Sequence, residues 1–168
     1  MKKVLQFSGV ISAVLGIVAI VLMMATNAIV VKVGSNQVVT AGTVAIFGET
    51  TKVLGVEIVT KPSPLALIGW ILALVAVVVV LCGVILPLLK VKGIEKFAGL
   101  MNLVAVVCFV VAGVFMFLVV PTFVSANGGE VSEYHHIGAG WVIGGILAIA
   151  AGAFAILPAA VDFLGKKK

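Results

Sequence analysis

Four long stretches without a charged residue dominate this sequence. No Asp, Glu, Lys or Arg occurs in 4–31, 62–89, 97–129 or 134–161, and the shortest of these stretches is 28 residues long. A helix needs about 20 apolar residues to cross the hydrocarbon core of a bilayer. Charged residues make up only 10% of the chain, compared with roughly 25% in soluble domains. The chain is therefore predicted to be an integral membrane protein with four spans.

Turn residues and lysines set the expected limits of the spans within one membrane domain, residues 1–168. We expect helices over about 6–31, 65–89, 97–124 and 141–164. The first of these resembles a signal peptide, but its apolar stretch exceeds the usual core of about 7–15 residues. We therefore expect it to be retained as a span. Residues 125–138 are polar and slightly acidic and are expected to form a loop.

Residues 32–63 have a different character from the spans. They contain β-branched runs at Gln37 to Thr40, Thr43 to Phe47 and Val53 to Thr60, with glycine-containing turns between them. Such a pattern predicts an antiparallel meander of three or four strands. A sheet this small is marginal by itself, so we expect it to rest on the helix ends. The expected fold class is an all-α, four-helix transmembrane bundle with a small extracellular antiparallel β-sheet in the first outer loop.

The distribution of lysines predicts the orientation of the chain. One side of the predicted membrane carries eight lysines: Lys2, Lys3, Lys90, Lys92, Lys96, Lys166, Lys167 and Lys168. The other side carries three: Lys32, Lys52 and Lys61. The positive-inside rule then predicts a multi-pass protein of the cell membrane with both termini cytoplasmic. All eleven basic residues are Lys and none is Arg, so no nucleic-acid partner is expected.

Small residues recur every four positions in the last and first spans. They are Gly140, Gly144, Ala148 and Gly152 in the last span, and Ser8, Ser12 and Gly16 in the first. This spacing places each set along one helix face, where small residues let helix backbones approach closely in lipid. The two faces are natural partners, and their contact can lie within one bundle or between protomers. Asn102, deep in the third span, is expected to form an interhelical polar contact.

Residues with catalytic or metal-binding chemistry are scarce. The loop before the last span contains Glu130, Glu133, His135 and His136, but adjacent histidines do not easily turn towards one ion. We interpret them as a solvated loop, with metal binding and pH sensing as alternatives. Cys82 and Cys108 fall inside spans and are expected to pack there as small apolar residues. No HExxH, GxSxG, GxxxxGK[ST] or CxxC motif occurs. We expect no enzymatic activity, no cofactor and no metal.

Two classes of function fit these features. The first is a non-enzymatic structural or assembly component that associates laterally through its small-residue helix faces and its outer β-cap. The second is an oligomeric pore or an accessory subunit of a transport complex, with candidate lining residues Ser8, Ser12, Asn27, Asn102 and Thr122. Transporters usually keep ionisable residues within the membrane, and these spans have none, which favours the first class. Expected partners are membrane lipids and either a second copy of the chain or another membrane protein.

The predicted layout resembles that of the claudin and peripheral-myelin tetraspan proteins. The shared features are four spans, cytoplasmic termini, a β-rich first outer loop, a short second loop and a long third helix. The resemblance covers the whole chain at the level of topology, and the family's Trp, Gly-Leu-Trp and paired Cys have no counterpart in 32–63. It implies a non-enzymatic protein that associates laterally and presents its outer sheet to neighbours or to another cell.

Overall fold

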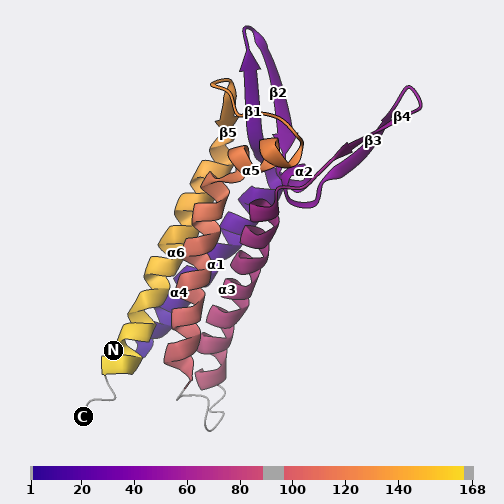
Figure 1. The fold of residues 1–168 in the computed structure, drawn as a ribbon. Helices are drawn as coiled ribbons and strands as arrows, with labels where there is room; N and C mark the ends of the chain where they lie inside the picture. The colour runs from indigo at the N-terminus through magenta and orange to yellow at the C-terminus, as the bar shows by residue number, and fades with distance from the viewer. Residues whose placement is uncertain (1, 89–96, 165–168) are drawn as a thin grey trace.

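Four long helices run side by side in the computed structural model, which describes residues 2–88 and 97–164 (Figure 1). They are α1 (Lys2–Ala25), α3 (Pro64–Leu88), α4 (Ala98–Phe117) and α6 (Ala139–Leu164). Each contains a segment of 19 or 22 residues that is long and apolar enough to cross a membrane. The chain is therefore a multi-pass membrane protein with a tetraspan layout.

The four helices pack in a ring in which α6 contacts α1 and α4, and α3 contacts α1 and α4. Phe109 fills the centre together with buried alanines from all four helices, namely Ala13, Ala76, Ala105 and Ala151. Small side chains at these positions let the helices approach closely, which is a main source of helix association in lipid. Valines and isoleucines on the opposite faces are exposed, as expected for helices surrounded by hydrocarbon.

The predicted third span is interrupted near its end. Helix α4 ends at Phe117, and a separate helix α5 (Val119–Ala126) follows after Leu118. Pro121 explains the break, because proline has no N–H to donate to the carbonyl four residues earlier and its ring clashes with that carbonyl. That carbonyl belongs to Phe117, the last residue of α4. The span predicted over 97–124 is therefore two helices.

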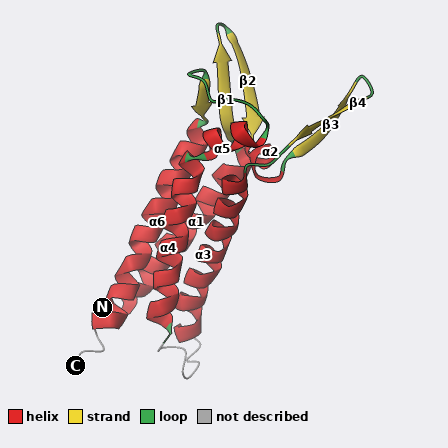
Figure 2. Ribbon diagram, in the orientation of Figure 1, coloured by secondary structure: helices red, strands yellow, loops and turns green. Residues whose placement is uncertain are grey.

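All strands lie at one end of the bundle, as Figure 2 shows. We call this part the cap and define it as residues 26–63 and 118–138. A three-stranded antiparallel sheet in the order β2-β1-β5 joins β1 (Asn27–Val33), β2 (Asn36–Ala41) and β5 (His135–Ile137). The first helix thus ends at Ala25 and not at residue 31, because the β-branched residues after it pair with β2 and β5.

The rest of the first loop also differs from the single meander predicted. The segment predicted as a strand over Thr43 to Phe47 is a short helix, α2 (Gly42–Phe47). Ala45 and Ile46 of α2 are fully buried in the cluster at the cap end of the bundle, and this contact outweighs the β propensity of the other residues in the segment. Strands β3 (Glu49–Val53) and β4 (Val56–Thr60) form a separate two-stranded sheet. The cap therefore holds two sheets, and the second loop contributes β5 to one of them.

Most of the lysines that predict the orientation lie outside the described residues: Lys90, Lys92, Lys96, Lys166, Lys167 and Lys168. Residues 90–96, between the second and third expected spans, lie outside them as well. Lys32, Lys52 and Lys61 are all in the cap.

Candidate functional site

The small-residue face of α6 packs inside the bundle. A Cβ built on Gly144 would lie 2.5 Å from Met116 Cε of α4 and 3.5 Å from the Ala19 carbonyl oxygen of α1. Ala148 is buried, Gly140 packs tightly on Thr26 at the end of α1, and Gly152 faces α4. This face of α6 therefore packs against α1 and α4 of the same chain.

The matching residues of α1 are divided among three helices. The Ser12 hydroxyl donates a hydrogen bond to the Ala151 carbonyl of α6, with an oxygen–oxygen distance of 2.7 Å. Gly16 instead faces Phe109 of α4 and Val77 of α3. Ser8 is also buried. Ser12 thus contacts α6, Gly16 packs against α4 and α3, and the α1 residue whose carbonyl lies beside Gly144 is Ala19.

Asn102 is buried where α3 meets α4, with its side-chain oxygen against Gly83. The absence of a side chain at Gly83 provides room for the amide. Cys82 and Cys108 are free thiols that are only partly buried. Thr122 lies in α5 and Asn27 is exposed in β1, so these two of the polar residues considered for a pore lie in the cap.

The junction between the bundle and the cap carries polar contacts that the sequence did not reveal. Trp141 is fully buried, and its indole nitrogen donates to the Met23 carbonyl at 3.0 Å. The Thr26 hydroxyl donates to the Leu22 carbonyl at 2.6 Å. The carbonyls in the last turn of a helix lack a partner within it. Trp141 caps the Met23 carbonyl, whereas the Leu22 carbonyl accepts from both the N–H and the hydroxyl of Thr26. No local sequence pattern identifies Trp141 as the hydrogen-bond partner of Met23, which lies 118 positions earlier in the chain.

A second set of contacts ties α5 to the start of α3. The Ser63 hydroxyl oxygen lies 2.6 Å from the Thr122 hydroxyl and accepts from the Ala66 N–H at 3.3 Å. The Thr122 hydroxyl donates onward to the Leu118 carbonyl at 2.8 Å. Serine before a proline is a typical helix start, so Ser63-Pro64 is the one sequence signal for this cluster.

Asn127 joins the two loops of the cap. Its side-chain oxygen accepts from the Lys61 backbone N–H at 2.8 Å, and its side-chain nitrogen donates to the Lys61 carbonyl at 3.0 Å. The same nitrogen donates to the Phe123 carbonyl at 2.9 Å. The amide therefore pairs with the backbone before α3 much as a neighbouring strand would.

The histidines of the second loop belong to β5. His135 pairs with Val31 of β1, and His136 pairs with Val30, so the two rings lie on opposite faces of the sheet. His135 Nδ1 accepts from the Ser132 N–H at 3.2 Å and lies 2.8 Å from the Ser132 hydroxyl. Within residues 2–88 and 97–164, no three His, Cys, Asp or Glu side chains form a group able to hold a metal ion.

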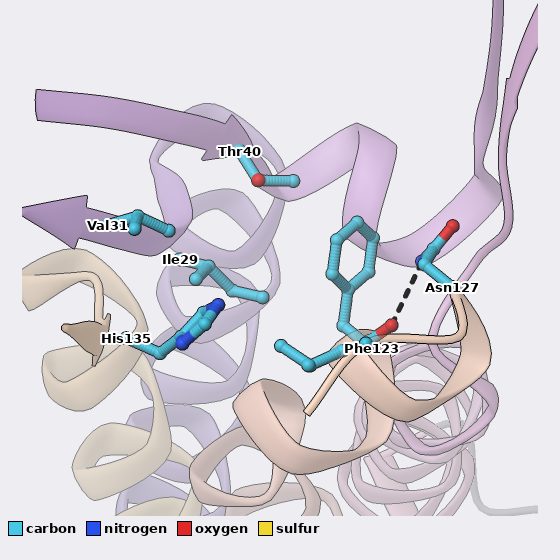
Figure 3. A pocket seen from close by; sticks show the side chains of 8 residues that line it. Ile29, Val31, Thr40, Phe123, Asn127 and His135 are labelled. Carbon is cyan, nitrogen blue, oxygen red and sulfur yellow. Dashed lines mark hydrogen bonds between the residues drawn. The ribbon is translucent and has the colours of Figure 1, made fainter. Parts of the chain in front are cut away.

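A cavity of about 210 Å³ lies between the three-stranded sheet and α5 (Figure 3). Its lining residues are Ile29, Val31, Thr40, Phe123, Val124, Asn127, Gly129 and His135. Most of this surface is apolar, with polar groups from Thr40, Asn127 and His135. Sequence patterns did not indicate it, because its walls come from both loops.

The β3–β4 hairpin projects away from the bundle and from the other sheet, as Figure 1 shows. Its two strands are exposed along almost their whole length. Leu54, at the tip, is 100% exposed and has a positive φ of 51°. A fully exposed leucine in this backbone region is unusual, because the left-handed conformation costs a non-glycine residue about 1–2 kcal/mol.

Comparison with known proteins identified no relative: the sequence matches no family model and no curated protein.

Proposed function

We propose that the protein is a non-enzymatic assembly component of the cell membrane, in which the helix bundle holds a cap that pairs with a second copy of the chain or with another membrane protein. The lysine distribution supports a cap on the extracellular side and cytoplasmic termini. In this role it resembles the claudin and peripheral-myelin layout, in which an outer sheet is presented to neighbours.

The observation that carries the proposal is the exposed apolar surface of the β3–β4 hairpin. Cross-strand pairs join Val53 with Val56 and Thr51 with Ile58, so these four β-branched side chains share one face. Val53, Val56 and Ile58 are between 48% and 64% exposed. An apolar face next to an exposed apolar tip is typical of a contact surface.

The backbone of the same hairpin supports pairing with another strand. In a two-stranded sheet each strand leaves one edge of N–H and C=O groups unpaired, and such edges bind further strands. Lys52 and Glu57 form an exposed ion pair with a nitrogen–oxygen distance of 2.9 Å. Residues 49–61 contain two Glu and two Lys, so two copies of the hairpin do not repel each other strongly. This neutrality favours a second copy as the partner.

The packing of α6 supports association through the cap and not through the small-residue faces. Gly144 and Gly152 already contact helices of their own chain, and lateral pairing through this face would require those helices to separate. The alternative function as a pore gains no support from the described residues, because Ser12 and Asn102 are buried at helix contacts.

Leu54→Asn separates association from folding. Asn-Gly is the preferred sequence for a two-residue hairpin turn with positive φ at both positions, so this change suits the turn while it removes the apolar tip. The full-length protein in nanodiscs is analysed by native mass spectrometry, with Ser35→Asn at the other hairpin tip as the matched control. We expect wild type and the control to form oligomers and Leu54→Asn to shift towards monomer. An unchanged oligomer distribution in Leu54→Asn refutes the role of the hairpin, and selective ion flux in bilayers containing the wild type favours the pore.

A further inference from the structure

The cavity between the three-stranded sheet and α5 has the size of a small-molecule site. It is open on one side and has a volume of about 210 Å³, whereas an enclosed apolar cavity of about 150 Å³ is enough to bind benzene. The walls come from β1, β2, β5 and α5, so the space depends on the folded cap and not on one loop. It can hold one aromatic ring or a short chain with a few further atoms.

The polar groups that line the cavity determine which hydrogen-bonding group a ligand needs. His135 Nδ1 accepts a hydrogen bond from the Ser132 N–H. A neutral imidazole that accepts at Nδ1 carries its proton on Nε2, which is then a donor. Figure 3 shows the His135 ring directed from β5 towards the space beside Ile29, with the Phe123 ring on the other side. The Thr40 hydroxyl lies on the same wall and is a second donor.

Asn127 shapes the cavity but has no donor left for a ligand. Its oxygen and nitrogen are already bonded to the backbone of Lys61 and Phe123. Gly129 adds no side chain, and a Cβ there would lie 3.1 Å from Val124 Cγ1. The available donors are therefore His135 Nε2 and the Thr40 hydroxyl, set in a mostly apolar surface.

We propose that this cavity binds a small amphiphile, with one ring or short chain and one hydroxyl or carbonyl oxygen that accepts a hydrogen bond. The apolar part fills the space lined by Ile29, Val31 and Phe123, and the oxygen faces either Thr40 or His135, which lie on the outer strands β2 and β5. The membrane-spanning segments of α1 and α4 end at Ala25 and Phe117, so the cavity lies just beyond them. Groups with one apolar and one polar end concentrate at this depth of a membrane, which supplies the ligand.

Fluorine NMR of 4-fluorophenol added to the full-length protein in nanodiscs tests the proposal, with empty nanodiscs as the reference for partition into lipid. Val31→Phe places a ring in the cavity, and Val30→Phe places the same ring on the opposite face of β1. Both changes suit a strand, and far-UV circular dichroism verifies folding. We expect saturable binding to wild type and Val30→Phe, and its loss in Val31→Phe.

The donors are tested with a shape-matched change and a ligand that lacks the oxygen. We expect 4-fluorophenol to bind wild type at least about fivefold more tightly than 4-fluorotoluene, as one hydrogen bond predicts. Thr40→Val, which keeps the shape of the side chain, is expected to reduce this preference. Binding that is equal in Val31→Phe and wild type, or that does not saturate above empty nanodiscs, overturns the site. Equal affinity for the two ligands overturns the assignment of the donors.

Discussion

The two tryptophans of this chain provide a controlled test of the junction between bundle and cap. Trp141→Phe removes the indole N–H that donates to the Met23 carbonyl at 3.0 Å, in a fully buried position. Leaving that carbonyl without a partner costs about 1–3 kcal/mol, and the space left by the smaller ring costs about 1 kcal/mol. We therefore expect the free energy of unfolding to fall by about 2–4 kcal/mol.

Trp70→Phe is the matched control, because the change in ring size is the same. The Trp70 indole nitrogen is buried without a hydrogen-bond partner among the described residues, and its ring packs edge-on against Phe47 with centroids 5.2 Å apart. Removing an unsatisfied buried donor offsets the lost packing, so we expect a change within about 1 kcal/mol of zero.

The comparison is made by titrating each full-length variant with SDS in mild detergent and following helix content by far-UV circular dichroism. Thiol labelling of Cys82 and Cys108, which are partly buried in the bundle, gives an independent measure of unfolding. Equal losses in the two variants would falsify the argument, because the ring size and not the Met23 hydrogen bond would then determine the effect.

Three further changes test other contacts. Gly138→Ala is expected to lower the thermal unfolding temperature more than Gly144→Ala. The methyl group added at position 138 meets the backbone carbonyl of Asn27, whereas the one added at position 144 meets the movable end of the Met116 side chain. A larger decrease for Gly144→Ala contradicts this geometry. Asn127→Ala is expected to lower the free energy of unfolding by about 1–2 kcal/mol and to speed limited proteolysis of the segment before α3. Asn36→Ala, at an exposed position in β2, is the control and leaves the proteolysis rate unchanged. Equal rates in the two variants refute the link between Asn127 and this segment. Ser12→Ala is expected to cost about 0.6–1.7 kcal/mol in SDS unfolding, since it deletes a 2.7 Å hydrogen bond to α6, and wild-type stability would exclude that contribution.

The helices were predictable because one property, the absence of charge over a long stretch, decides whether a segment can cross a membrane. Helix α6 (Ala139–Leu164) lies close to the range predicted for the last span. The prediction for the end of the first span is wrong because residues 29–31 are both apolar and β-branched. Length alone does not separate the end of a spanning helix from the start of a strand in such a run.

The errors in the cap share one physical cause, which is contact between residues far apart in the chain. Thr43 to Phe47 has the composition of a strand, but burial of Ala45 and Ile46 on the bundle makes it helical. The sequence predicts that His135 and His136 belong to a solvated loop, yet both residues pair with β1. The cavity and the Trp141 hydrogen bond depend on the same kind of contact, so local patterns do not reveal them.

The pairing of β1 with β5 has a consequence for synthesis of the chain. Val31 is made long before His135, its partner, and the carbonyl of Met23 is likewise made long before Trp141. The edge of β1 therefore stays unpaired until β5 is made, and the Met23 carbonyl lacks its side-chain partner until Trp141 of the last helix is made. A product truncated before β5 keeps both defects, so the junction between bundle and cap is complete only after the chain has been made as far as the last helix.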